Sequence, residues 1–156
     1  MNLILWRHAD SESGSPDSAR RLTEHGHLQA GRVSAWLKPR LPAGCEVLVS
    51  PAVRAQQTAL ALGMAFVTAP GVGTNANAAD LVAAARWPTH PGTVVIVGHQ
   101  PTLGRVAALL LSGVEADWEL AKGALWWLAY RNGTVALRGV VDPELVHTPG
   151  GMTEDP

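Results

Sequence analysis

The chain of 156 residues is 47% hydrophobic and 16% charged, and its formal net charge is -1. This length suits a single domain, and the apolar content is sufficient for a buried core, which excludes an intrinsically disordered chain. The near-neutral charge gives no reason to expect nucleic-acid binding. Any anionic ligand therefore needs a local cluster of cationic side chains.

Two further features indicate the compartment. The single cysteine, Cys45, cannot form an intramolecular disulfide, which is typical of a reducing compartment. No apolar run approaches the length of a transmembrane helix, and the first residues lack the basic leader and long apolar core of a signal peptide. We therefore expect a cytoplasmic protein without a membrane partner.

The N-terminal quarter predicts a strand, a loop and a helix. Residues 3–6 are a short apolar run without alternation, as expected for a strand buried on both faces. Residues 9–21 are polar and are expected to form a loop. Thr23 is the expected N-cap of a helix whose apolar residues recur at helical spacing until Pro39.

The middle of the chain repeats this alternation. Residues 47–49 predict a second strand, and Ser50-Pro51 is expected to serve as N-cap and first-turn proline of a helix that reaches about Gly63. Residues 64–68 predict a third strand. A surface loop over 70–77 and a short helix over 79–86 follow.

The C-terminal part predicts one more strand and helix and then a hairpin. Residues 93–97 are a β-branched run typical of a buried strand, and a helix is expected over 101–111. Residues 126–130 and 134–140 are expected to be paired strands, because the Asn132-Gly133 dipeptide between them is a hairpin signal.

The order of these elements predicts the fold class. Alternating strands and helices indicate an α/β three-layer sandwich, with a mainly parallel central sheet and helices on both faces. The closing hairpin requires at least one antiparallel strand. We expect residues 1–146 to form a single domain and residues 147–156 to form a flexible C-terminal tail.

Three of the predicted strands lead into side chains that suit an anion. The first strand runs into Arg7-His8, the second is followed by Arg54, and the strand over 93–97 runs into Gly98-His99. The carboxyl ends of strands in an open parallel sheet share one edge, where ligands bind. Helix N-termini that follow two of these strands would add a partial positive charge. The sequence therefore predicts a phosphate site at this edge.

The same residues form a set of strings that resembles a known family. The strings are Arg7-His8, Ser50-Pro51-x-x-Arg54-Ala55-x-x-Thr58-Ala59 and Gly98-His99. In this order they resemble the histidine phosphatase superfamily, also called the phosphoglycerate mutase-like fold. The compact length and the string Arg20-x-Leu22-Thr23-x-x-Gly26 are similar to its short bacterial branch, the phosphohistidine phosphatases. The resemblance extends over residues 1 to about 110.

The resemblance implies a mechanism without a metal or cofactor. His8 would attack phosphorus and become transiently phosphorylated, and water would then cleave the phosphohistidine. Arg7, Arg54 and His99 would bind the phosphoryl oxygens, a role that suits the planar, permanently charged fork of arginine. A neutral imidazole is a usable nucleophile when an acceptor holds its other nitrogen.

Other positions have two open interpretations each. Arg20 is a candidate substrate-binding residue or an ordinary loop charge. Ser50 is a candidate ligand or, more simply, a helix N-cap. Gln100 is a candidate substrate contact or a loop and cap residue.

Two departures from the family pattern concern the chemistry. Ala9 stands where the family usually has glycine, and its methyl group would crowd the loop if the backbone there required a positive φ. No glutamate occurs between Ala52 and Thr102, where larger relatives have a general acid, so Asp80 is the candidate acid. A phosphohistidine leaving group that is already protonated would need an acid less.

These features favour one function over two others. The first interpretation is a phosphatase that removes phosphate from phosphohistidine on a protein, such as a histidine-carrier domain. The second is a phosphomonoesterase acting on a small phosphorylated metabolite such as a sugar phosphate. The third is a non-catalytic phosphate-binding module. In each case the expected partner is phosphorylated, and neither nucleic acid nor membrane is expected.

Overall fold

A mixed β-sheet runs through the protein, and the computed structural model describes residues 1–147. The strands are β1 (Asn2–Arg7), β2 (Glu46–Val49), β3 (Val67–Thr68), β4 (Thr93–Gly98), β5 (Leu125–Arg131) and β6 (Thr134–Val141). The helices are α1 (Glu24–Leu37), α2 (Val53–Leu60), α3 (Ala78–Ala84) and α4 (Thr102–Ser112), with short 3-10 helices at η1 (Asp17–Ala19), η2 (Lys38–Arg40) and η3 (Pro70–Val72). Apart from His147, the predicted tail lies outside the described residues.

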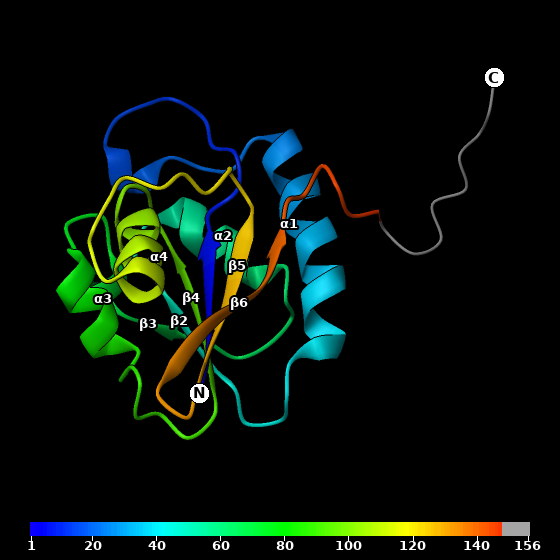
Figure 1. Ribbon diagram of the computed structural model, residues 1–156. Coiled ribbons are helices and arrows are strands. Elements are labelled where there is room, and N and C mark those ends of the chain that lie inside the picture. Colours follow the sequence, from blue (N-terminus) through cyan, green and yellow to red (C-terminus); the bar gives the residue numbers. More distant parts are fainter. Residues whose placement is uncertain (148–156) are drawn as a thin grey trace.

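The strand order places sequence-distant segments next to one another. It is β3-β2-β4-β1-β5-β6, so β4 lies between β1 and β2 (Figure 1). The first four strands in this order are parallel, whereas β5 pairs antiparallel with both β1 and β6. The prediction of a mainly parallel sheet with at least one antiparallel strand is confirmed.

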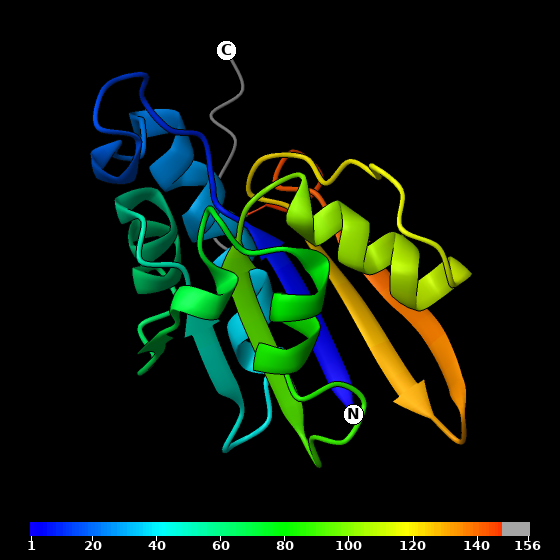
Figure 2. The same ribbon diagram turned by 90° about the vertical axis from the view of Figure 1, so that its left-hand side faces the viewer.

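Helices cover both faces of the sheet, as Figure 2 shows. Along β1, Ile4 and Trp6 pack in a core cluster with residues of α1 and α2, such as Leu37 and Ala59. Leu3 and Leu5 point to the opposite cluster, which contains residues of α3 and α4. Successive side chains of a strand face opposite sides, so an uninterrupted apolar run is required when both faces are covered. The three-layer sandwich is confirmed.

Local capping residues explain several element boundaries. The Thr23 hydroxyl accepts a hydrogen bond from the Gly26 backbone N–H at 2.9 Å, so the predicted N-cap of α1 is confirmed. In the hairpin, Asn132 and Gly133 have φ angles of 51° and 77°. Positive φ at both central positions matches the right-handed twist of the flanking strands. The predicted hairpin is confirmed as well.

Two boundaries differ from the sequence prediction. Helix α2 begins at Val53 and not at Ser50-Pro51: Ala52 is the N-cap residue, and Ser50 Oγ, which accepts from the Ala52 N–H at 3.2 Å, lies before the helix. The strand expected over 64–68 is shorter than predicted: β3 contains only Val67 and Thr68, the two residues that pair with β2. Among residues 1–147, no helix combines the length and apolar character needed to cross a membrane.

Candidate active site

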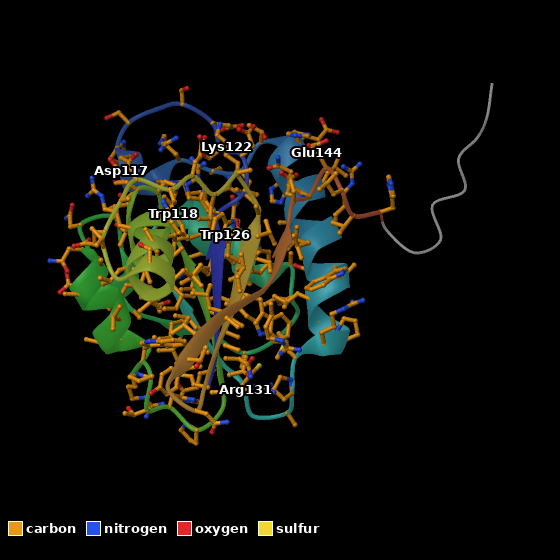
Figure 3. All side chains as sticks on the ribbon, viewed as in Figure 1. Asp117, Trp118, Lys122, Trp126, Arg131 and Glu144 are labelled. Atoms are coloured by element: carbon orange, nitrogen blue, oxygen red, sulfur yellow. The ribbon has the colours of Figure 1, made fainter. Side chains whose placement is uncertain are left out.

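The carboxyl ends of β1, β4 and β2 meet at one edge of the sheet (Figure 1). A cavity of about 380 Å³ opens there. Predicted site residues that line it are Arg7, His8, Arg20, Arg54, His99 and Gln100. Residues that the sequence analysis did not select also line it: Ser11, Ser13, Asp17, Thr74 and Lys122. Figure 3 shows Lys122 at this end of the molecule and Arg131, in the hairpin, at the other.

His8 is fixed by its backbone and by one ring nitrogen. Its N–H donates to the Gly98 carbonyl at 3.0 Å, its carbonyl accepts from the Gly123 N–H at 3.1 Å, and its side chain is only 7% exposed. Nδ1 lies 2.7 Å from the Ala9 carbonyl oxygen. A carbonyl oxygen can only accept, so Nδ1 carries the proton, and Nε2 is unprotonated and accepts a hydrogen bond from Arg54 Nε. This is the backbone acceptor that a nucleophilic imidazole requires.

The electrostatic surroundings keep this imidazole neutral. Burial, together with the nearby His99, Arg54 and Arg7, lowers the pKa of His8 to about 3, although the hydrogen bond to the Ala9 carbonyl opposes this shift. At neutral pH, His8 therefore presents an unprotonated Nε2 to the cavity.

Arg54 connects His8 Nε2 with Asp17 at the mouth of the cavity. It lies in the first turn of α2 and is 4% exposed. Its Nε is 3.3 Å from His8 Nε2, while Nη1 and Nη2 donate to the backbone oxygen and Oδ2 of Asp17 at 2.9 and 3.1 Å. The guanidinium has five N–H donors, so two are left for a ligand.

Thr58 joins the two segments that carry these residues. Its hydroxyl donates to the Arg54 carbonyl at 2.8 Å and accepts from the Ala9 N–H at 3.0 Å. Ala9 is fully buried, and it is absent from the residues with positive φ. The methyl group at this position therefore fits without backbone strain, and the hydroxyl of Thr58 fixes the loop after His8.

His99 and Arg7 complete the floor of the cavity. His99 is 6% exposed, and its Nε2 lies 2.7 Å from Ser50 Oγ. Burial, followed by the charge of Arg54, lowers the pKa of His99 to about 4. Its Nδ1 and the Nε of Arg7 are both buried without a hydrogen-bond partner among residues 1–147. Buried donors and acceptors normally have partners, so these two atoms suit a ligand with several oxygens.

Three other predicted site residues are not free to contact a ligand in the cavity, because they lie outside its lining or their side chains are held by other groups. Ser50 is fully buried beneath His99 and is not part of the cavity lining. Gln100 lines the cavity, but its amide is held by the Trp118 carbonyl and the Gly104 N–H, each at 2.8 Å. Asp80 is outside the lining and forms a capping box at the start of α3, where its carboxylate accepts the Asn77 N–H at 3.0 Å. Sequence reasoning placed Asp80 in the site only because no other acid occurs in that segment.

The rim contains a carboxylate that the sequence analysis missed. Asp17 Oδ1 accepts from Arg20 Nε at 3.0 Å, and Asp17 Oδ2 accepts from Arg54. The available signal was the spacing, because opposite charges three residues apart can pair within one helical turn. Lys122 is a second unpredicted rim residue, and its Nζ lies 2.8 Å from Asp10 Oδ1.

A larger cavity, of about 640 Å³, lies at the other end of the strands, where β1 and β4 begin. Its lining includes Trp36, Arg40, Trp127 and Arg138, with each guanidinium stacked on a tryptophan. None of the described residues that line it is a histidine, cysteine, aspartate or glutamate, so the smaller cavity is the candidate active site. Within residues 1–147, no group of three or more His, Cys, Asp or Glu side chains could hold a metal ion.

Comparisons with known proteins agree with this geometry. Residues 3–71 match the model of the histidine phosphatase superfamily (branch 1). An uncharacterized protein of Mycobacterium tuberculosis is 33% identical over 128 residues, which cover 70% of this chain and 73% of that protein. A phosphohistidine phosphatase SixA homolog of Haemophilus influenzae is 39% identical over 72 residues, which cover 42% of this chain and 44% of that protein.

Solved structures share the fold over nearly the whole chain. The protein histidine phosphatase SixA complexed with tungstate superposes with a TM-score of 0.74 at 24% identity and covers 92% of this chain and 97% of its own. The SixA protein of Nakamurella multipartita gives a TM-score of 0.74 at 25% identity, with 91% and 95% covered. The chain belongs to the histidine phosphatase superfamily and is an enzyme of the phosphatase class.

Proposed function

We propose that this enzyme transfers a phosphoryl group to His8 and that its preferred substrate is phosphohistidine on a protein. The observation that carries the proposal is the state of His8. Its Nδ1 proton is held by the Ala9 carbonyl, and its Nε2 faces Arg54 at 3.3 Å inside the cavity. This is the tautomer and orientation that nucleophilic attack on phosphorus needs.

The charges around His8 support phosphoryl transfer. Arg7, Arg20, Arg54 and Lys122 line the cavity, and Asp17 and Asp10 pair with two of these rim cations, which leaves a net charge of about two positive units at neutral pH. A phosphoryl group carries up to two negative charges. Catalysis of its transfer depends mainly on positioning and on stabilisation of charge spread over its oxygens. Arg7, Arg54 and His99 would bind those oxygens, and no step requires a metal or cofactor.

The reaction has two steps. In the first, His8 Nε2 forms a bond to phosphorus while the bond from phosphorus to the leaving nitrogen or oxygen breaks. In the second, water attacks the phosphorus of phosphorylated His8, the bond from phosphorus to Nε2 breaks, and inorganic phosphate is released. Because the pKa of His8 is about 3, the imidazole is ready to attack over the whole physiological pH range.

The absence of a neutral acid in the cavity favours a phosphohistidine substrate. The one carboxylate among the described lining residues, Asp17, has a pKa below its usual value because Arg20 donates a hydrogen bond to it. It is therefore ionised at neutral pH and cannot donate a proton. An alkoxide leaving group needs a proton in the transition state, whereas a protonated phosphoimidazole departs without one. The similarity to the two SixA structures is consistent with this choice.

A small-molecule phosphatase is the second candidate. The phosphoserine phosphatase of Entamoeba histolytica has the same fold, with a TM-score of 0.69 at 18% identity over 89% of this chain and 95% of its own. The fold therefore accommodates small phosphomonoesters in relatives. The third interpretation, a non-catalytic phosphate-binding module, is not retained, because the comparisons identify the chain as an enzyme of the phosphatase class.

One comparison of substrates tests the proposal. The enzyme is incubated in excess EDTA with a phosphorylated histidine-carrier domain and, separately, with a sugar phosphate at equal enzyme concentration. We expect a kcat/KM at least about 100-fold higher for the phosphoprotein. Faster turnover of the sugar phosphate would support the second candidate and contradict the proposal.

A further inference from the structure

Asp17 is held between two arginines at the mouth of the cavity. Oδ1 lies 3.0 Å from both Arg20 Nε and Arg20 Nη2, and Oδ2 lies 3.1 Å from Arg54 Nη2. A carboxylate offers about four lone-pair positions, so these three contacts leave one acceptor position, on Oδ2. The side chain is 60% exposed, which means that a bound molecule can reach that position.

The position of Asp17 relative to His8 determines what it would meet. In phosphoryl transfer the attacking and leaving atoms lie roughly in line on opposite sides of phosphorus. His8 is buried at the floor, so the leaving group must point towards the exposed mouth, where Asp17 lies. The floor therefore contacts the phosphoryl group, and the rim contacts whatever leaves it.

We propose that Asp17 is a specificity-determining residue that accepts a hydrogen bond from the protonated ring nitrogen of a phosphohistidine leaving group. This inference rests on the proposed function. The carboxylate stabilises the positive ring of the bound substrate and disfavours groups that depart as anions. Asp17 thus selects by the charge of the leaving group, while Arg7 and Arg54 recognise the phosphoryl group that all substrates share.

The electron balance explains the difference between leaving groups. When His8 Nε2 attacks, the P–N bond breaks and its electron pair moves to the ring nitrogen of the substrate. Since the other ring nitrogen already carries a proton, the imidazole leaves as a neutral molecule. In 4-nitrophenyl phosphate the P–O electron pair moves to oxygen instead, and an anion develops beside the carboxylate, which is unfavourable.

The other charged groups at this site do not duplicate the role of Asp17. Arg20 and Arg54 contact its carboxylate directly, and Lys122 is paired with Asp10. The remaining titratable groups of the lining, Arg7, His8 and His99, lie on the floor. The burial of His8 and His99 lowers the pKa of each well below neutral, so neither titrates near pH 7.

The test compares Asp17→Asn with the wild-type enzyme on phosphoimidazole and on 4-nitrophenyl phosphate. Asparagine keeps an acceptor for one arginine but removes the charge. We expect kcat/KM for phosphoimidazole to fall relative to that for 4-nitrophenyl phosphate by about tenfold. Asp117→Asn is the matched control, because Asp117 is an exposed aspartate paired with Arg105 outside the cavity, and it should leave this ratio unchanged.

A pH profile provides a readout that a merely structural role would not change. The profile of kcat reports groups in the enzyme–substrate complex, including the ring of bound phosphoimidazole. A carboxylate favours the protonated ring, so Asp17→Asn should move the alkaline limb of this profile to lower pH by about one unit. No corresponding limb should move with 4-nitrophenyl phosphate, whose leaving group carries no ring proton.

The outcomes separate this inference from the proposed function. Asp17→Asn could lower kcat/KM equally for both substrates and leave the alkaline limb of the pH profile in place. In that case Asp17 only orients Arg54, and the inference is wrong while the proposed function stands. If the wild-type enzyme hydrolyses 4-nitrophenyl phosphate but not phosphoimidazole, the proposed substrate class is wrong, and the inference is wrong with it.

Discussion

The floor and the rim of the cavity are built differently. The floor residues His8, Arg54 and His99 are each less than 10% exposed, and they follow strands or begin a helix of the central framework. The rim residues Asp17 and Lys122 lie outside the main helices and strands, and their side chains are 60% and 51% exposed. The buried side chains of the floor keep a fixed geometry and have little contact with water. The charges of the exposed rim interact more weakly, because water and salt screen them.

Because of this difference, we expect the floor to determine the rate of phosphoryl transfer and the rim to determine which substrates are preferred. Each floor residue has few alternative conformations, because its neighbours are packed and its hydrogen bonds are internal. Rim charges form ion pairs and individually contribute less energy, but under the proposed function they would face the leaving group of the substrate. Mutations in the floor should therefore affect every substrate strongly, and mutations in the rim should affect substrates weakly and unequally.

Replacement of the nucleophile gives the largest expected effect. His8→Ala should lower kcat by at least about a thousandfold, because the phosphorylated enzyme intermediate cannot form. Acid-labile, base-stable phosphate should be trapped on the wild-type enzyme and not on the variant. His90→Ala is the matched control, because His90 is a buried histidine at the other end of β4, and it should retain turnover. Activity of His8→Ala above a tenth of wild type would exclude His8 as the nucleophile.

Removal of a floor arginine gives the next largest effect. Arg54→Ala should cost roughly 3–5 kcal/mol of transition-state stabilisation, because the phosphoryl charge would be left uncompensated in a buried site. Arg54→Lys should restore only part of this loss, since lysine lacks the two-pronged fork. The exposed Arg105 provides a control in Arg105→Ala. Complete rescue of kcat by lysine would show that net charge alone matters.

The two floor histidines should also make stability depend on pH. Below about pH 6.5 the unfolded chain protonates these imidazoles, whereas the folded chain resists protonation until pH approaches the lowered pKa values of about 3 for His8 and about 4 for His99. Unfolding therefore takes up protons in this window, and the free energy of unfolding falls as pH falls. Between pH 8 and pH 5 the loss should be roughly 2 kcal/mol for each histidine.

Urea unfolding of variants at both pH values measures this contribution. His99→Gln should reduce the difference in unfolding free energy between pH 8 and pH 5 by roughly 2 kcal/mol. His27→Gln, at an exposed position on α1, should leave the difference unchanged. An unchanged difference in His99→Gln would mean that His99 titrates normally in the folded protein.

A change at the rim gives the smallest effect. Lys122→Met removes the partner of Asp10 and one exposed cation of the lining. We expect kcat/KM for 4-nitrophenyl phosphate to change by less than about threefold, because exposed ion pairs contribute roughly 1 kcal/mol or less. Raising the salt concentration should reduce even this difference. A hundredfold loss would place Lys122 with the floor residues and contradict the division between the two regions.

The same division explains what could be predicted from the sequence. Residues 3–6 and 93–97 were recognised as strands because burial on both faces demands continuous apolar runs, and parallel strands bring Arg7-His8 and His99 to one edge. The acceptor for His8 Nδ1 is a backbone carbonyl, and such groups leave no mark in the residue types. Ser50 is hydrogen-bonded to His99, a residue far away in the sequence, so its place before the N-cap of α2 could not be read from the local residue pattern.

The rim was less predictable for a physical reason. Asp17 and Lys122 belong to segments without apolar periodicity, so the sequence does not show that they lie at the cavity; the spacing of Asp17 and Arg20 indicates only that these two residues can pair. Asp80 was selected because it is the only acid in its segment, but local capping of α3 accounts for its position. Long-range placement of exposed polar residues depends on the whole fold.

The central position of β4 has a consequence for the order in which the molecule can be assembled. Strand β4 separates β1 from β2, and no pairing joins those two strands directly. A nascent chain that has left the ribosome up to residue 71, the end of the family match, already carries His8 and Arg54. It lacks the strand that holds them at the correct distance. The candidate active site can therefore form only after residues 93–98 lie between β1 and β2.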